Sequence, residues 1–176
     1  MQLHRSQRSV INRIRRLEAE DHGAAIAIYR EAVLSCSASL YSSEQRSAWA
    51  AQAEQLAPVL QRGRGLVSCT QAGQVEAFVV RDPPDRISLL YCRPASQRQG
   101  RARELLRGAE AEVSHAIFSG ALQCRNDRLR TEASFLSRDL FLSEGWQVSW
   151  QEELLIRGRL FRRFHLQKTL RSAPSP

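Results

Sequence analysis

The stretch RISLLYCRPASQRQGRARELL, residues 86–106, places a strand, a basic loop and a helix next to one another. Its first seven residues are mostly apolar, which is typical of a buried strand, and Pro94 and Ser96 end that strand. From Gly100 to Ile117 apolar residues recur at helical spacing. They are Ala102, Leu105, Leu106, Ala109, Val113 and Ala116. The basic loop therefore leads directly into the first turn of a helix.

This loop has the features of an anion site. The first N–H groups of a helix have no partner inside the helix, and they carry partial positive charge. Gly100 lets another group approach the backbone closely, and Arg98 and Arg101 add charge on either side. These features suit a phosphate or pyrophosphate, whereas the alternative interpretation is a solvated basic turn. The sequence has neither the Gly-Lys-Ser/Thr ending of a P-loop nor a GxGxxG pattern.

The rest of the chain predicts an α+β fold around one mostly antiparallel sheet. Further strands are predicted at 11–17, 65–70, 74–81, 129–133, 146–156 and 160–168, and further helices at 20–34, 41–56 and 134–144. Ser42 and Gln45 have the spacing of a capping box at the start of the second helix. We expect one domain over residues 11–170, with flexible ends at 1–10 and 171–176.

Charge and composition narrow the range of partners. The chain has 176 residues, with 26 Lys and Arg against 18 Asp and Glu, so its formal net charge is +8. This excess favours acidic partners such as phosphates, nucleic acid or an anionic metabolite. Aromatic residues make up 7% and the basic residues are scattered, which disfavours nucleic-acid binding. No apolar window is long enough to span a membrane, and a cytoplasmic location is expected.

The cysteine and histidine residues do not predict a metal site. Cys36, Cys69, Cys92 and Cys124 are far apart in sequence, and none forms a CxxC pair. Reduced, mostly buried thiols are therefore expected rather than zinc ligands or disulfides. His115 and His165 are predicted to be structural or solvated.

The loop resembles a known signature. Residues 97–102, Gln-Arg-Gln-Gly-Arg-Ala, are similar to the Q/R-x-x-G-x-G/A pattern of the GNAT superfamily of N-acetyltransferases, with Ala in the last place. Residues 14–33 resemble the family's first strand and helix, 41–50 a second-helix segment of a bacterial branch, and 129–148 a strand, a helix and a Gly-aromatic element. The resemblance implies a GNAT-like fold: a single mixed, mostly antiparallel sheet, about four flanking helices and a V-shaped splay between the two central strands.

The resemblance also implies transfer of an acetyl group from acetyl-coenzyme A directly to an amine, without a metal. It implies a cofactor site formed by Leu90, Tyr91, Cys92, Gln97, Arg98, Gln99, Gly100, Arg101, Ala102, Ser134, Arg138 and Phe141. In this interpretation the N–H groups of 98–102 hold the pyrophosphate. An amide on the 90–92 edge polarises the thioester carbonyl.

In this interpretation the reaction needs a base that takes a proton from the amine and a donor that gives one to the departing thiolate. Glu132 is the first candidate for the base that takes the proton of the amine, and Glu76 is the second. The family usually has a Tyr as proton donor where this chain has Phe141, and a phenyl ring cannot donate. Tyr91 or Ser137 is then the alternative donor, or the thiolate leaves unaided.

The sequence is also compatible with other functions, and it does not identify the acceptor. Tyr41 and Trp49 are predicted to border the acceptor pocket, but the acceptor itself is not identified, and a homodimer is left open. Phe141 also motivates a second hypothesis, a catalytically degenerate acyl-CoA-binding or regulatory module. The net charge motivates a third, a nucleic-acid-binding protein.

Overall fold

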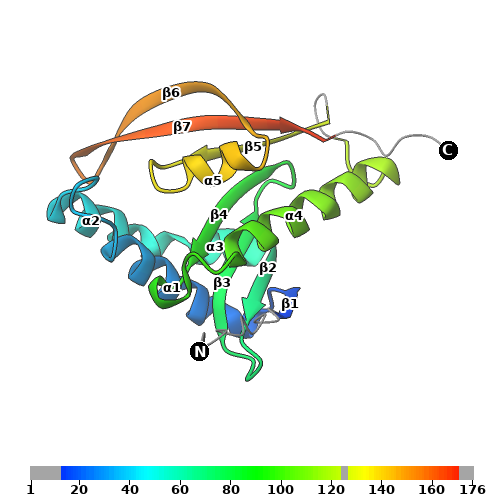
Figure 1. Cartoon of the computed structure of the whole chain (residues 1–176), viewed down its shortest axis with the longest axis horizontal. Helices are drawn as coiled ribbons and strands as arrows, with labels where there is room; N and C mark the ends of the chain where they lie inside the picture. The colour runs from blue at the N-terminus through cyan, green and yellow to red at the C-terminus, as the bar shows by residue number, and fades with distance from the viewer. Residues whose placement is uncertain (1–12, 124–126, 171–176) are drawn as a thin grey trace, which may run out of the picture.

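The computed structural model describes residues 13–123 and 127–170 (Figure 1). The predicted flexible ends, the first two residues of the predicted strand at 11–17, and Cys124 lie outside the described residues. Figure 1 shows a curved sheet whose long last two strands arch over the top of the view, with helices packed below and in front.

Seven strands form one sheet in the order β1-β2-β3-β4-β5-β7-β6. The strands are β1 Arg13–Arg16, β2 Arg64–Cys69, β3 Val75–Arg81, β4 Arg86–Cys92, β5 Arg128–Ala133, β6 Gln147–Ile156 and β7 Arg159–Thr169. All neighbouring strands are antiparallel except β4 and β5, which are parallel. The predicted mixed, mostly antiparallel sheet is therefore confirmed.

The two central strands separate after a short contact. β4 pairs with β5 only through Arg86 with Arg130 and Ile87 with Thr131. The Thr131 hydroxyl donates to the Ile87 carbonyl at 2.9 Å, at the point where the strands meet. A register shift against β3 makes Ser88 an extra residue in β4, and such a bulge bends a strand. Beyond it the β4 edge has no strand partner on the β5 side among the described residues, which confirms the predicted V-shaped splay.

The described part of the chain has five helices where about four were predicted, and two of the predicted helices are shorter than expected. They are α1 His22–Leu34, α2 Ser43–Ala50, α3 Ala57–Arg62, α4 Arg101–Phe118 and α5 Arg138–Ser143, with 3-10 turns at Ala19–Asp21, Ala51–Gln55 and Pro94–Ser96. The capping box is present: Gln45 N–H donates to Ser42 Oγ at 3.2 Å, and Ser42 N–H donates to Gln45 Oε1 at 2.9 Å. The predicted helix at 134–144 begins only at Arg138, because Ser134 and Ser137 hydroxyls accept backbone N–H groups in a preceding turn.

Two hydrophobic cores lie on opposite faces of the sheet. One packs under α4 and α5 and includes Leu105, Leu106, Leu129, Phe141, Trp146 and Leu166. The other packs under α1 and α3 and includes Ile28, Tyr29, Val33, Leu60, Phe78 and Val80. Because side chains alternate along β4, Leu90 contacts the first core and Tyr91 the second. The free edge of β4 therefore lies between the two layers of helices.

Candidate functional site

The opening between β4 and β5 continues into a cleft of about 890 Å³, a size typical of small-molecule sites. Its walls are the free edge of β4, the loop and first turn of α4, the segment from β5 into α5, the end of α1, and Trp49. Elements distant in sequence thus meet around one cavity.

The loop before α4 presents its backbone to the cleft. Gly100 is the N-terminal cap of α4 and has φ +82°, and Arg98 has φ +59°. No side chain caps the 18-residue helix α4, so its first N–H groups have no partner inside the helix. Left-handed residues at such a turn bring consecutive N–H groups towards one concave face, which is an arrangement that binds anions.

The Arg101 side chain lies beneath this loop. It is only 3% exposed, and its Nη1 donates to Ser68 Oγ at 3.0 Å and to the Cys69 carbonyl at 3.4 Å. Its Nε has no hydrogen-bond partner, and none of the ion pairs in the described part of the chain includes Arg101. Arg101 also lines the cleft, so it places an uncompensated buried charge behind the N–H groups of the loop.

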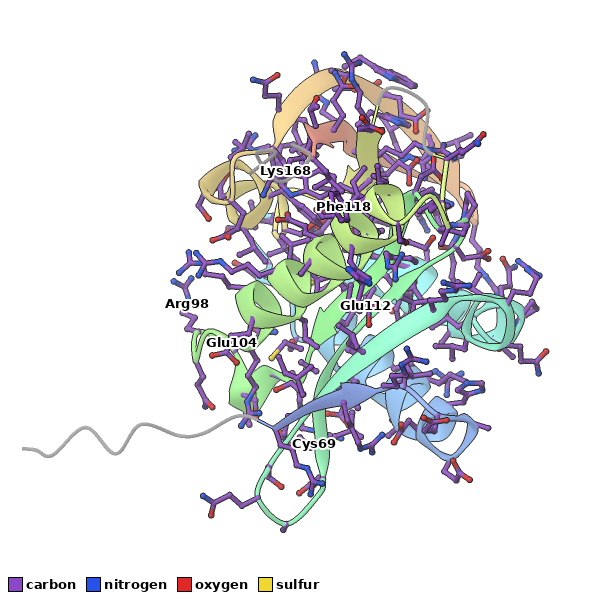
Figure 2. All side chains as sticks on the ribbon, turned by 90° about the vertical axis from the view of Figure 1, so that its right-hand side faces the viewer. Cys69, Arg98, Glu104, Glu112, Phe118 and Lys168 are labelled. Atoms are coloured by element: carbon purple, nitrogen blue, oxygen red, sulfur yellow. The ribbon has the colours of Figure 1, made fainter. Side chains whose placement is uncertain are left out.

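Of the remaining loop residues, Arg98 points to the surface, and Gln97 and Gln99 form hydrogen bonds to the backbone. Arg98 is exposed and lines the cleft, and Figure 2 shows it projecting outward ahead of α4. Gln97 Nε2 donates to the Cys92 carbonyl at 3.3 Å, and Gln99 Nε2 donates to the Ala95 carbonyl at 3.2 Å. The two amide side chains therefore hold the loop, and of the two only Gln97 also lines the cleft.

Two buried polar residues, Glu76 and Ser96, and the half-buried Arg93 fix the start of the loop, and we call these three residues the loop anchor. The Ser96 hydroxyl donates to the carboxylate of Glu76, which is 6% exposed. Arg93 N–H donates to the Glu76 carbonyl at 2.8 Å, and Arg93 Nε lies 3.7 Å from Glu76 Oε1. Arg93 Nη1 also donates to both carboxylate oxygens of Glu31 in α1. Glu76, the second candidate base, does not line the cleft.

Glu132, the first candidate base, lines the cleft with its side chain 14% exposed. Its Oε2 accepts from Arg86 Nε at 2.8 Å and from Arg86 Nη2 at 2.6 Å. Its Oε1 lies 3.8 Å from Nδ1 of His165, the residue opposite Glu132 in β7. The carboxylate is thus held by one oxygen and presents the other.

His165 continues this row of side chains across the sheet. Its Nε2 is 2.7 Å from Glu152 Oε1, and its ring stacks on Trp150 with centroids 3.7 Å apart. The hydrogen bond to His165, with that to Arg163, holds the pKa of Glu152 below its usual value. The sequence did not single out Arg86 or Glu152, because only strand pairing brings them to Glu132 and His165.

The two candidate proton donors both line the cleft, together with Phe141. The Tyr91 ring packs against Tyr29 at 4.7 Å and Phe78 at 5.9 Å, and burial raises the pKa of Tyr91 well above its usual value. Its phenol therefore stays protonated through the neutral range. Ser137 is the residue before α5. Phe141 is 2% exposed and makes an edge contact with Trp146 at 5.0 Å, as a core residue does.

The remaining predicted residues do not all reach the cleft. Trp49 and Ser134 line it. Tyr41 is buried among aromatic rings, and its hydroxyl accepts the Phe135 N–H at 3.3 Å. The Arg138 guanidinium lies 4.9 Å from the centre of the Phe164 ring and is not among the lining residues.

The cleft thiol is predicted to be unreactive at neutral pH. Burial raises the pKa of Cys92 to about 11 and that of Cys36 likewise to about 11, because the thiolate is poorly solvated there. We expect iodoacetamide at pH 8 to leave both thiols unmodified in the native protein, and reactivity to rise as the pH approaches 11. Peptide mass spectrometry, with the urea-unfolded chain as reference, measures this. Rapid native labelling of Cys92 at pH 8 would contradict a neutral, packed thiol.

Two negative observations concern the described residues only. Within 13–123 and 127–170, no group of three or more His, Cys, Asp or Glu side chains is placed to hold a metal ion. In the same residues, no helix has the length and apolar character needed to cross a bilayer.

Comparison with known proteins places this architecture. No family model and no curated protein matches the chain. Among solved structures, a GCN5-related N-acetyltransferase from Rhodopseudomonas palustris matches with TM-score 0.77 and 25% identity, over 90% of this chain and 96% of that one. A Sinorhizobium meliloti phosphinothricin acetyltransferase in complex with acetyl-CoA has TM-score 0.63 and 18% identity, over 90% and 88% of the two chains. The PaiA N-acetyltransferase of Thermoplasma acidophilum, in complex with coenzyme A, has TM-score 0.64 and 19% identity, over 90% and 98%. The chain therefore has the fold of these GNAT-superfamily N-acetyltransferase structures.

Proposed function

We propose that this protein transfers the acetyl group of acetyl-CoA to an amine. The observation that carries the proposal is the uncapped start of α4, with buried Arg101 behind it, opening onto the free edge of β4. A helix N-terminus backed by a buried cation suits a pyrophosphate, and an unpaired strand edge suits an extended amide-containing arm. Two structural neighbours were solved with acetyl-CoA or coenzyme A, which supports the same ligand here.

In this proposal the backbone does most of the binding. The N–H groups of 98–102 hold the pyrophosphate, and Gln97 and Gln99 keep that loop in shape. The β4 edge at 90–92 pairs with the pantetheine arm, and one of its amides polarises the thioester carbonyl. Ser134 lies on the opposite wall. Acetyl-CoA supplies the activated acetyl group, and the chain supplies position and charge.

Proton transfer falls to side chains that line the cleft. An amine attacks only as the free base, and Glu132 can accept the proton because its Oε1 accepts no hydrogen bond within the described part of the chain. Tyr91 and Ser137 are both among the residues that line the cleft, and they are the candidate donors to the departing thiolate. Phe141 cannot take part in this step, and we assign it to the core.

A non-catalytic acyl-CoA-binding module is the second candidate, because Phe141 stands where the family usually has a donor. Release of free thiol separates the two candidates. Turnover of acetyl-CoA that depends on an added amine supports the transferase, whereas tight binding without turnover for any amine supports the binding module.

Isothermal titration with acetyl-CoA tests the common basis of both candidates. We expect saturable binding to the purified chain. No binding at millimolar ligand would rule out both.

A substitution in the loop anchor should weaken acetyl-CoA binding to an intermediate degree. Ser96→Ala removes the hydroxyl that donates to Glu76, so the loop should become more mobile and the Kd for acetyl-CoA should rise by about tenfold. Ser96→Thr keeps the hydroxyl and should restore affinity. Amide hydrogen exchange at 97–103 should be faster in Ser96→Ala alone. Unchanged exchange and unchanged affinity would show that the anchor does not set the loop.

A further inference from the structure

The positively charged side chains that line the cleft all come from one segment of the chain. Arg98, Arg101 and Arg103 are the only Arg, Lys or His residues of the described chain that line it, and all three belong to the loop and first turn of α4. Other parts of the cleft wall come from the last turn of α1, from Trp49, and from Glu132 and the serine-rich turn after it. No cation outside this loop and turn lines the cleft among the described residues, and the Arg86 guanidinium that lies nearby is already paired with Glu132.

The carboxyl end of α1 also lines the cleft, and a cation already binds its last carbonyl groups. Ala32, Val33 and Ser35 line the cleft at the carboxyl end of this 13-residue helix, where the helix dipole is negative. The nearby cation is already engaged: Arg46 Nη1 donates to the Cys36 carbonyl at 2.9 Å and to the Leu34 carbonyl at 3.4 Å. Arg46 does not line the cleft, so it cannot serve as the counter-charge of a bound anion.

Glu132 contributes a carboxylate to the cleft wall. Both hydrogen bonds from Arg86 go to Oε2, whereas Oε1 accepts no hydrogen bond within the described residues and lies 3.8 Å from His165 Nδ1. On its far side, His165 is engaged by Glu152 and covered by Trp150. A partly buried carboxylate oxygen in this position favours an ammonium donor. It disfavours a second carboxylate, because like charges side by side repel.

We propose that the acceptor is a primary amine whose body carries no carboxylate or phosphate. Glu132 receives its ammonium group, and Trp49 forms an aromatic wall for an apolar body. This inference rests on the proposed acetyl transfer and concerns its second substrate. It excludes α-amino acids as preferred acceptors, although the net charge of +8 taken alone would favour acidic ones.

Three related amines test the proposal: phenethylamine, phenylalanine amide and phenylalanine. The first two lack the carboxylate, and the amide matches phenylalanine in size. After correction for the fraction of free base, kcat/KM should be at least about tenfold higher for both neutral-bodied amines than for phenylalanine. Titration of the same amines into the enzyme with bound coenzyme A gives a readout that does not need turnover.

A pair of variants assigns the effect to Glu132. Glu132→Gln removes the negative charge, so overall kcat/KM should fall while the preference against phenylalanine shrinks towards one. Glu112→Gln is the control, because Glu112 in α4 pairs with Arg81, does not line the cleft, and should leave the preference unchanged.

The outcomes separate the two levels of proposal. Equal or better use of phenylalanine would overturn the acceptor class while leaving acetyl transfer intact, and so would a preference that Glu132→Gln leaves unchanged. If the protein binds acetyl-CoA but neither acetylates nor binds any of the three amines, the proposed acceptor class is also overturned. Failure to bind acetyl-CoA is a separate result that removes the proposed function itself.

Discussion

Gly100→Glu is expected to abolish acetyl-CoA binding, raising the Kd by at least about 100-fold, while the protein remains folded. Gly100 has φ +82°, which costs a residue with a Cβ about 1–2 kcal/mol. The substituted side chain has room, because a Cβ there would approach only Glu104 Oε1, at 3.9 Å. The larger effect is electrostatic: a carboxylate at the start of α4 occupies the place proposed for the pyrophosphate and repels it.

Gly73→Glu is the matched control for this variant. Gly73 lies in the turn between β2 and β3, has φ +85°, and has nothing within 4 Å of a built Cβ. It therefore carries the same backbone strain and the same added charge, away from the cleft. Gly100→Ala isolates the strain, and we expect it to weaken binding only a few-fold. Titration calorimetry and thermal unfolding measure all three variants. Equal losses for Gly100→Glu and Gly73→Glu would show that the anion does not bind at this loop.

The fold could be predicted from the sequence pattern because the strand, the loop and the helix that define it follow one another in the chain. The strand ending at Cys92, the loop and α4 are contiguous, and their hydrophobic periodicity predicts both element types. Ser42 and Gln45 likewise predicted a helix start that the structure has. The start of α5 was wrong, because Ser134 and Ser137 hydrogen-bond to the backbone and compete with helix formation, which apolar spacing does not reveal.

The candidate site could be predicted best where it consists of backbone. The resemblance singled out 97–102, of which all but Gln99 line the cleft, but side-chain directions depend on packing between distant segments. Arg138 had been expected on the cleft wall and instead lies over Phe164. Glu132 had been expected as the first candidate base, and strand pairing places Arg86 and His165 next to it. Such relations across β4, β5 and β7 leave no mark in the spacing of a single sequence.

Arg101→Met is expected to raise the Kd for acetyl-CoA by about 30-fold with little change in stability. The Arg101 guanidinium is buried, no carboxylate in the described part of the chain pairs with it, and its Nε has no partner. Burying such a charge is costly, and a Met of similar length removes that cost. Loss of the bonds to Ser68 and Cys69 opposes this gain, so the free energy of unfolding should change by no more than about 1 kcal/mol.

Affinity for acetyl-CoA, unlike stability, should fall clearly in Arg101→Met. The bound diphosphate supplies the counter-charge that Arg101 lacks in the fold, and this attraction is lost with the guanidinium. Low exposure means that little solvent screens this attraction. Arg103→Met is the control: Arg103 also lines the cleft but is 48% exposed and already pairs with Glu144 at 2.8 Å, so its loss should cost only a few-fold. Acetyl-pantetheine, which has no pyrophosphate, should bind wild type and Arg101→Met alike. An equal loss for both ligands would make Arg101 a purely structural residue, whereas a loss confined to acetyl-CoA assigns its charge to the phosphates.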